Sequence, residues 1–309
     1  MRGFEAHVRN DVALLHRDFL FILAMVLTLA LFVIIAFVHS SMYAENASWA
    51  TMDIEEVKNQ QQSIIHQYWM SIMGVESLVI LLFSVLIFAV ENETGTFALT
   101  LTYGVKPWQV HLSKILVMTV IGAMLSIISL IFFIIIFSSM NELFVSLPEL
   151  LSSAIFPMLF STTIASLGLF VSVLFRKKNS AVVVSLIILF SMQATFSFGM
   201  SIGYNDALQD LSAESTYFDI TNEDIRDSFP QHMKLLLSLN PFVIQEGLIH
   251  TTVDSQEILG NAGRQYFTLM DIWGDLALGL SMILSLNILS IIALNRRYTV
   301  RHVKYEEPM

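Results

Sequence analysis

Residues 115–138 have the sequence ILVMTVIGAMLSIISLIFFIIIFS, and this stretch decides the fold class. It contains no Asp, Glu, Lys, Arg or Pro. An α-helix rises about 1.5 Å per residue, so about 20 apolar residues cross the roughly 30 Å hydrocarbon core of a bilayer. The stretch therefore predicts a helix that spans a membrane.

Five other segments have the same character, at residues 20–38, 69–90, 151–175, 181–203 and 273–294. Their apolar residues are continuous rather than alternating, which excludes a β-barrel. Of the 309 residues, 55% are hydrophobic and 14% are charged, whereas about a quarter are charged in a soluble domain. We predict an all-α polytopic membrane protein with six spans and a single domain over residues 1–309.

The basic residues predict the orientation of the chain. Residues 1–19, 91–115, 176–180 and 295–309 hold 12 of the 16 Lys and Arg residues. Positive residues concentrate in cytoplasmic segments, so both termini should be cytoplasmic, as six spans require. The location predicted is the plasma membrane.

Two hydrophilic segments flank the spans. Residues 3–18 place apolar side chains on one face of a basic helix, which predicts an interfacial helix on the inner leaflet; a frayed terminus is the alternative. Residues 204–267 form an acidic extracytoplasmic segment. Within this segment, Pro241 suits the first turn of a helix lying at, or dipping into, the outer membrane surface; a plain loop is the alternative.

Signatures of catalysis are missing from the sequence. There is no cysteine, which excludes disulfides, thiolate nucleophiles and Cys-ligated metals. No P-loop, His-Glu-x-x-His or Gly-x-Ser-x-Gly motif is present, and the eight histidines are scattered. We expect a protein that is not an enzyme and that holds no metal or cofactor in this chain.

The predicted cytoplasmic connection between the second and third spans, residues 91–114, is ENETGTFALTLTYGVKPWQVHLSK. Thr94 or Thr96 can cap a short helix that runs to Leu101. Pro107 suits the first turn of a second helix that continues into the third span. The connection therefore predicts two helices rather than an open loop.

Two carboxylates, Glu91 and Glu93, precede this short helix. They could offer a docking surface to Arg or Lys side chains of a partner protein. They could equally belong to a solvated loop whose acids favour a helix N-terminus. The composition of the loop alone does not decide between the two.

The same residues resemble the first cytoplasmic loop of ABC-2-type permeases, the membrane subunits of ATP-binding-cassette exporters with a type V-like fold. The pattern Glu-x-Glu-x-Gly-Thr, then Leu-x-Leu, then a Lys opening the third span is matched by Glu91, Glu93, Gly95, Thr96, Leu99, Leu101 and Lys114. The sequence departs from the pattern at Gly104, where the family usually has Pro, and at Pro107 and Trp108, where a basic residue is common.

The resemblance implies that this loop forms a coupling helix for separate ATPase subunits, which would bind ATP and Mg. It also implies a second permease chain, identical or homologous, and export of an amphipathic or hydrophobic cargo such as a lipid, a peptide or a drug-like compound. Lys114 would lie at the inner interface and could reach lipid phosphates. Membrane lipid is an expected partner, and nucleic acid is not.

Two other functions fit the same layout. The chain could be a scaffold or mechanotransmitter that uses ATPase motion to act on an extracytoplasmic partner through residues 204–267. It could also be an ATP-independent secondary carrier. Such carriers show ionisable residues at mid-membrane and repeat symmetry between their halves, and neither feature is obvious in this sequence.

Four polar residues in or near the spans are candidates for a substrate path: Glu76, Gln193, Asp271 and Asp275. An ionisable group inside a span is a functional candidate. Glu76 could contact cargo, pair with a basic residue, stay neutral, or reach outer water as an interfacial Glu. Gln193 could instead form a hydrogen bond across helices.

Overall fold

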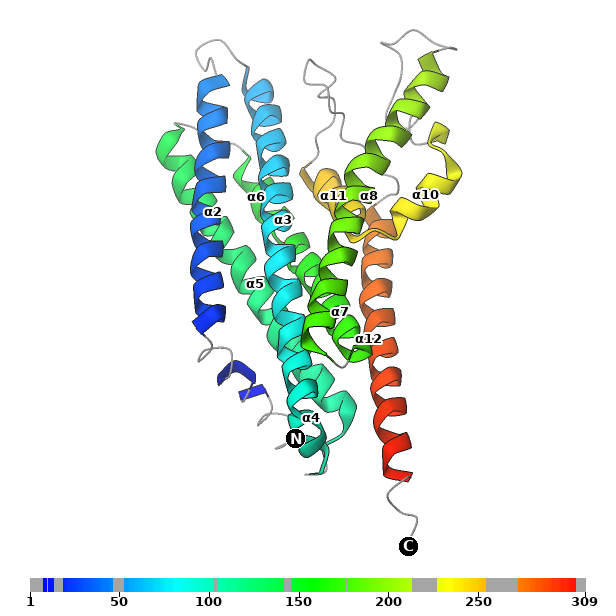
Figure 1. Cartoon of the computed structure of the whole chain (residues 1–309). Helices are drawn as coiled ribbons and strands as arrows, with labels where there is room; N and C mark the ends of the chain where they lie inside the picture. Colours follow the sequence, from blue (N-terminus) through cyan, green and yellow to red (C-terminus); the bar gives the residue numbers. More distant parts are fainter. Residues whose placement is uncertain are drawn as a thin grey trace, which may run out of the picture.

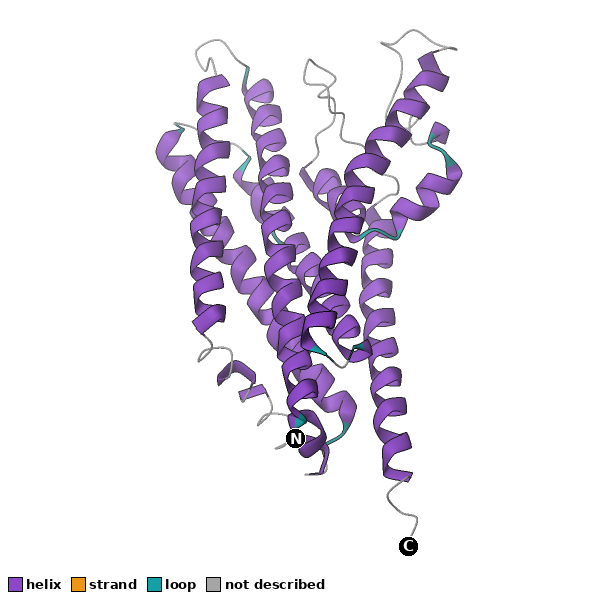
Figure 2. Ribbon diagram, in the orientation of Figure 1, coloured by secondary structure: helices purple, strands orange, loops and turns teal. Residues whose placement is uncertain are grey.

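The computed structural model describes residues 8–9, 11–13, 19–46, 53–102, 105–141, 146–175, 177–212, 227–253 and 272–303. Within these ranges the protein is helical and contains no strand (Figure 2). The helices are α2 (Phe19–Asn46), α3 (Ile54–Thr94), α4 (Thr96–Thr102), α5 (Pro107–Met140), α6 (Leu147–Ser153), α7 (Ile155–Leu174), α8 (Lys178–Ser212), α10 (Gln231–Ser238), α11 (Pro241–Val253) and α12 (Ile272–Val303).

Six helical segments are long and apolar enough to cross a membrane, which confirms the six spans predicted from the sequence. They are α2, α3, α5, α6 with α7, α8 and α12. Several extend well beyond the predicted bounds, and α3 is the longest at 41 residues. Hydropathy missed these extensions because polar helical turns outside the hydrocarbon carry no apolar signal.

The bundle is built around α3 and α7. The apolar windows of these two segments are two-thirds buried, whereas those of α2, α8 and α12 are mostly exposed. In Figure 1, α2 lies to one side of α3 and α8 and α12 lie to the other, while α5 crosses behind α3. The exposed side chains of the outer helices are large and apolar, as expected where a helix faces lipid.

Small residues let α3 and α7 approach closely. A Cβ atom at Gly168 of α7 would overlap with the hydroxyl of Ser84 and lie 3.0 Å from the carbonyl oxygen of Leu81, both in α3. Without a hydrophobic force between helices in lipid, such close backbone approach is a main source of association. Hydrogen bonds also tie α3 to its neighbours. Tyr68 donates to the carbonyl of Ser129 at 2.6 Å, and Trp69 donates to the hydroxyl of Ser153 at 2.9 Å.

Helix α11 begins where the sequence predicts it, at Pro241, with the carboxamide oxygen of Asn240 accepting a bond from the backbone N–H of Phe242. Whether this helix lies at, or dips into, the outer membrane surface stays a prediction. Helix α11 packs against α12, α7, α6, α3 and α8, and Phe242 and Leu248 are buried. Its apolar residues are spread around the helix, and a helix that is apolar on all sides is stable only when surrounded.

The two ends of the bundle differ. Helix α4, the described N-terminal residues and the last turns of α12 lie at one end, called here the α4 end (Figure 1). Helices α10 and α11 lie toward the opposite, α11 end. The distribution of Lys and Arg predicts that the α4 end is cytoplasmic.

We predict that Gly168→Ala destabilises the bundle, whereas Gly74→Ala does not. Both glycines lie in membrane-spanning helices, but a Cβ at Gly74 meets no atom within 4 Å. Overpacking costs about 1–3 kcal/mol. Unfolding of the two purified variants in detergent should show a lower midpoint for Gly168→Ala alone, and equal midpoints would contradict the close contact between α3 and α7.

Candidate functional site

Helix α4 is held between two long helices at the α4 end of the bundle. Gly95 ends α3 with φ 78°, a left-handed conformation that lets the chain turn directly into α4. Pro107 opens α5, with Lys106 at its N-cap. The two helices predicted for residues 91–114 are therefore present, and the first of them is seven residues long.

Phe97 anchors α4 to the bundle. Its side chain is fully buried, with its ring centroid 5.0 Å from that of Phe88 in α3 and 4.8 Å from that of Tyr298 in α12. Val110 of α5 and Leu169 of α7 complete the same apolar cluster. A short helix is unstable alone, so these contacts determine where α4 lies.

Lys114 forms the electrostatic centre of this end. Its ammonium group lies 2.9 Å from Oε1 of Glu91 and 3.0 Å from Oδ1 of Asp11, and the other carboxylate oxygen of Asp11 accepts a bond from Ser113. Lys114 is 0% exposed and Asp11 is 1% exposed. The expectation that Lys114 reaches lipid phosphates is therefore wrong, because two carboxylates of the same chain surround its amine.

The network joins three segments that are far apart in the sequence. Asp11 belongs to the N-terminal segment, Glu91 to the end of α3 and Lys114 to the start of α5. Val8 packs against the cluster around Phe97, whereas Val12 is half-exposed. The described N-terminal residues thus attach to the base of α4; most of the predicted interfacial helix at residues 3–18 lies outside the described residues.

Asn92, which lies between the two glutamates, was not predicted as a site residue. Its carboxamide donates to the carbonyl of Phe175 at 3.2 Å and accepts from the hydroxyl of Tyr298 at 3.0 Å. It therefore links the end of α3 to the α7–α8 connection and to α12. In the sequence, Asn92 stands out only as the middle residue of the Glu-x-Glu pattern, and nothing there indicates its contacts with Phe175 and Tyr298.

Most of the remaining predicted coupling residues are exposed. Glu93 is exposed, with Oε2 at 3.4 Å from the backbone N–H of Lys178, and Thr96 and Leu99 are exposed on α4. Leu99 is 56% exposed, and Leu101 is half-buried against the Phe97 cluster. The glutamates therefore differ: Glu91 faces inward to Lys114, and Glu93 faces out.

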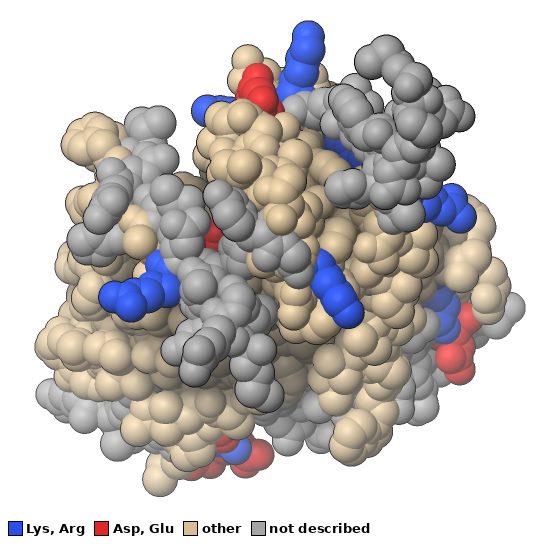
Figure 3. Space-filling model, turned by 90° about the horizontal axis from the view of Figure 1, so that it is seen from below, with Lys and Arg blue, Asp and Glu red and all other residues tan. Residues whose placement is uncertain are grey.

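The face at the α4 end carries Lys and Arg side chains spread around it rather than gathered into a patch (Figure 3). We use the name α4 face for five exposed residues, one at the end of α3 and four in α4: Glu93, Thr96, Ala98, Leu99 and Thr102.

Glu76 is fully buried inside the bundle, which excludes contact with outer water in this conformation. Ser161 of α7 and Ser126 of α5 lie 2.5 Å and 3.1 Å from its Oε1 atom. The carboxyl group thereby joins three spans by hydrogen bonds, and Gly122 of α5 packs beside Ser161. Its role as a cargo contact stays a prediction.

The other predicted path residues are placed differently. Gln193 is exposed on α8. Asp275 is 3% exposed at the start of α12, against Gly247 of α11. Asp271 lies outside the described residues. The structure therefore does not gather these side chains into one site.

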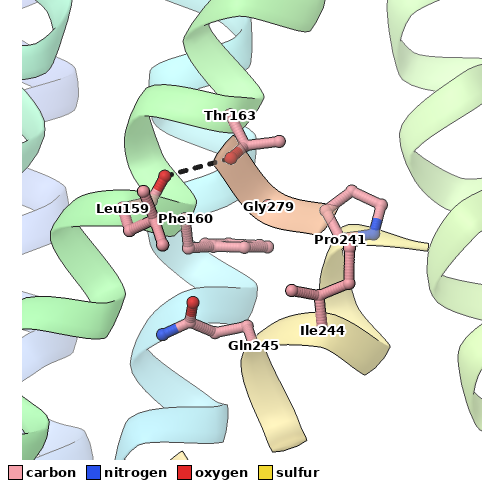
Figure 4. Close-up of a pocket in the computed structure, with 7 residues that line it drawn as sticks. All are labelled: Leu159, Phe160, Thr163, Pro241, Ile244, Gln245 and Gly279. Atoms are coloured by element: carbon pink, nitrogen blue, oxygen red, sulfur yellow. Dashed lines mark hydrogen bonds between the residues drawn. The ribbon is translucent and has the colours of Figure 1, made fainter. Parts of the chain in front are cut away.

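A small cavity lies where α7, α11 and α12 meet (Figure 4). Its volume is about 10 Å³, room for about one water molecule. The residues around it are Leu159, Phe160, Thr163, Pro241, Ile244, Gln245 and Gly279. The described residues contain no group of His, Asp or Glu side chains that could hold a metal ion.

Residues 8–298 match the family of ABC-2 family transporter proteins. The chain belongs to the ABC-2 transporter family. It is therefore a multi-pass plasma membrane permease of an ABC transporter, a membrane transport component and not itself the ATPase. ABC-2 permeases imply ATPase partner subunits and often form dimers. Comparison with curated proteins finds no match.

We predict that Lys114→Met destabilises the permease by about 3–5 kcal/mol, because two carboxylates are left facing each other without their cation. Lys106→Met is the matched control, since Lys106 is exposed eight residues earlier. Unfolding in detergent micelles measures both. Adding Asp11→Asn and Glu91→Gln to Lys114→Met should restore most of the lost stability, and failure to do so would show that packing, not charge, is responsible.

Proposed function

We propose that this permease couples ATP hydrolysis by separate ATPase subunits to export of an amphipathic or hydrophobic cargo, and that α4 is the coupling helix. The observation that carries the proposal is the structure of α4 itself. Helix α4 is fixed at its inner side by Phe97 and presents Leu99 outward, beside the exposed Glu93 of the last turn of α3, at the end predicted to be cytoplasmic. A docking surface needs both a shape that persists and groups that a partner can bind.

Rigidity at the base of α4 lets force reach the spans. The aromatic contacts of Phe97 join α4 to α3 and α12, and Lys114 joins the end of α3 to the start of α5. A push on the α4 face is then passed to the long helices instead of being absorbed by a flexible loop. ATPase closure does work only if the two conformations of the permease dock differently to the ATPase.

The α4 face suggests how an ATPase is recognised. Leu99 offers an apolar contact, and Glu93 offers a carboxylate for an Arg or Lys of the partner. Glu91 is engaged within the chain by Lys114, so its contribution is to hold α4 in place. Of the two acids, Glu93 is the one available to a partner.

Helix α8 is the proposed boundary of the cargo path. Gln193 is exposed on this span, and an exposed amide facing lipid is costly. A second permease chain or cargo against this face would remove that cost. The carboxamide of Gln193 needs a hydrogen-bonding partner, and hydrocarbon does not supply one.

A second function has a specific observation in its favour. The mechanotransmitter, acting on an extracytoplasmic partner, requires structure beyond the membrane at the α11 end. Helix α8 continues to Ser212, past the predicted end of its span at residue 203, and α10 packs against it. Ala207 of α8, Phe229 and Leu237 of α10 form a small apolar cluster there. A packed cluster of this kind can transmit displacement to a bound protein.

Glu93→Lys tests the coupling role. The tagged permease is purified in mild detergent from its native membrane, and the proteins that accompany it are identified by mass spectrometry. We expect an ATPase chain with the unaltered permease and its loss with Glu93→Lys, because the reversed charge repels a basic partner. ATP-dependent transport should fall in parallel.

Glu56→Lys is the matched control, because Glu56 is exposed on the same helix at the opposite end. It should keep the ATPase bound. An unaltered permease that folds but carries no ATPase would contradict the proposal and favour a carrier that works without ATP. Equal ATPase binding by both variants would remove Glu93 from the docking surface.

A further inference from the structure

Helix α12 contacts the proposed coupling helix α4 at one end and α11 at the other. It is continuous from Ile272 to Val303, and its apolar window is only 11% buried. Its buried residues include Asp275, Gly279, Ser290, Leu294 and Tyr298. The spacing of these residues places them along one face, so a narrow stripe joins α12 to the rest of the bundle.

At the α4 end, Tyr298 contacts both α4 and the end of α3, and Leu294 of α12 packs in the same apolar cluster as Phe97. The ring of Tyr298 lies 4.8 Å from that of Phe97 in α4, and its hydroxyl donates to the Oδ1 atom of Asn92 at 3.0 Å. Beside it, Arg297 donates to the carbonyl of Val173 at 2.8 Å. Any displacement of α4 must therefore move Tyr298 or break its contacts.

At mid-helix, Asn287 ties α12 to two central spans. Its Oδ1 atom is 2.8 Å from Nε2 of His111 in α5, and its amide nitrogen donates to the hydroxyl of Ser166 in α7 at 3.0 Å. At 1.5 Å per residue, Asn287 is about 16 Å from Tyr298 and about 18 Å from Asp275. The polar attachment thus lies close to the middle of the helix.

At the α11 end, α12 presses directly on α11. A Cβ atom at Gly247 would overlap with the Oδ2 atom of Asp275, so the two helices are in backbone-to-side-chain contact there. One turn further along α12, Gly279 borders the small cavity shared with Ile244 and Gln245 (Figure 4). The cavity leaves limited space into which α12 can shift.

We propose that α12 is a lever that carries the movement of α4 to α11, with Tyr298 as the positioning residue at its driven end and Asn287 as its pivot. Because the two arms are of similar length, displacement of Tyr298 in one direction moves the α11 end by a comparable distance in the other. The inference rests on the proposed coupling role of α4. It adds a route from the ATPase to the extracytoplasmic side through a helix outside the α3–α4–α5 connection.

The absence of cysteine from the chain allows a direct test. A single cysteine is introduced as Leu239→Cys, two residues before α11, where the side chain is 57% exposed. The permease is reconstituted in nanodiscs with its ATPase. The rate of maleimide labelling of this chain is then compared with and without a non-hydrolysable ATP analogue.

In the parent protein we expect nucleotide to change the labelling rate by about fivefold or more, the lower range of allosteric coupling. Tyr298→Leu keeps apolar volume but loses the ring and the hydroxyl, and it should abolish this difference while leaving the nucleotide-free rate unchanged. Asn92→Ala removes the hydrogen-bond partner without changing α12 and should reduce the difference. Ile288→Ala, on the exposed face of α12, is the control and should keep it.

A nucleotide response that persists in Tyr298→Leu with the ATPase bound would overturn the lever and leave the coupling role of α4 standing. The lever would also be overturned if the parent protein binds ATPase and transports, but nucleotide does not change the labelling rate at position 239. Loss of ATPase from the parent protein is detected in the same sample by gel. That result would overturn the proposed function and the lever with it.

Discussion

The amine of Lys114, buried between the carboxylates of Asp11 and Glu91, fixes the arrangement of the α4 end. A buried cation is costly unless charged partners surround it, so the N-terminal segment and the end of α3 must both be in place when α5 begins. This requirement sets the spacing within which α4 has to fit. Phe97 then seats α4 against α3 and α12, and the α4 face turns outward.

Within the spans, the helices are held together by close packing at small residues and by hydrogen bonds to serine hydroxyls rather than by ion pairs. Gly168 lets α7 lie against Ser84 of α3, and Glu76 bonds to serines of α5 and α7. These contacts make α3, α5 and α7 a common core, and α2, α8 and α12 surround it with exposed faces.

Much of the fold could be predicted from the sequence. The spans follow from apolar runs, and Pro107 and Pro241 correctly predicted where α5 and α11 begin. The prediction that failed concerns which way a side chain faces. Lys114 was expected to reach lipid and is buried between two carboxylates. The sequence also carried no sign that α11 packs against α12, α7, α6, α3, α8 and α10. The direction in which a side chain or helix faces depends on neighbours that are distant in the sequence, and a single sequence does not reveal which residues these are.

By itself the sequence determined the class of protein, the number of spans and the short helix between the second and third. These follow from local properties, since apolar length, proline position and helix capping act over a few residues. Only the tertiary structure decided that Glu91 faces inward while Glu93 faces out, and that Asn92 and Tyr298 meet. Residues 206 positions apart were brought together because α12 packs against α7, α11 and α5, and packing is a property of the whole bundle.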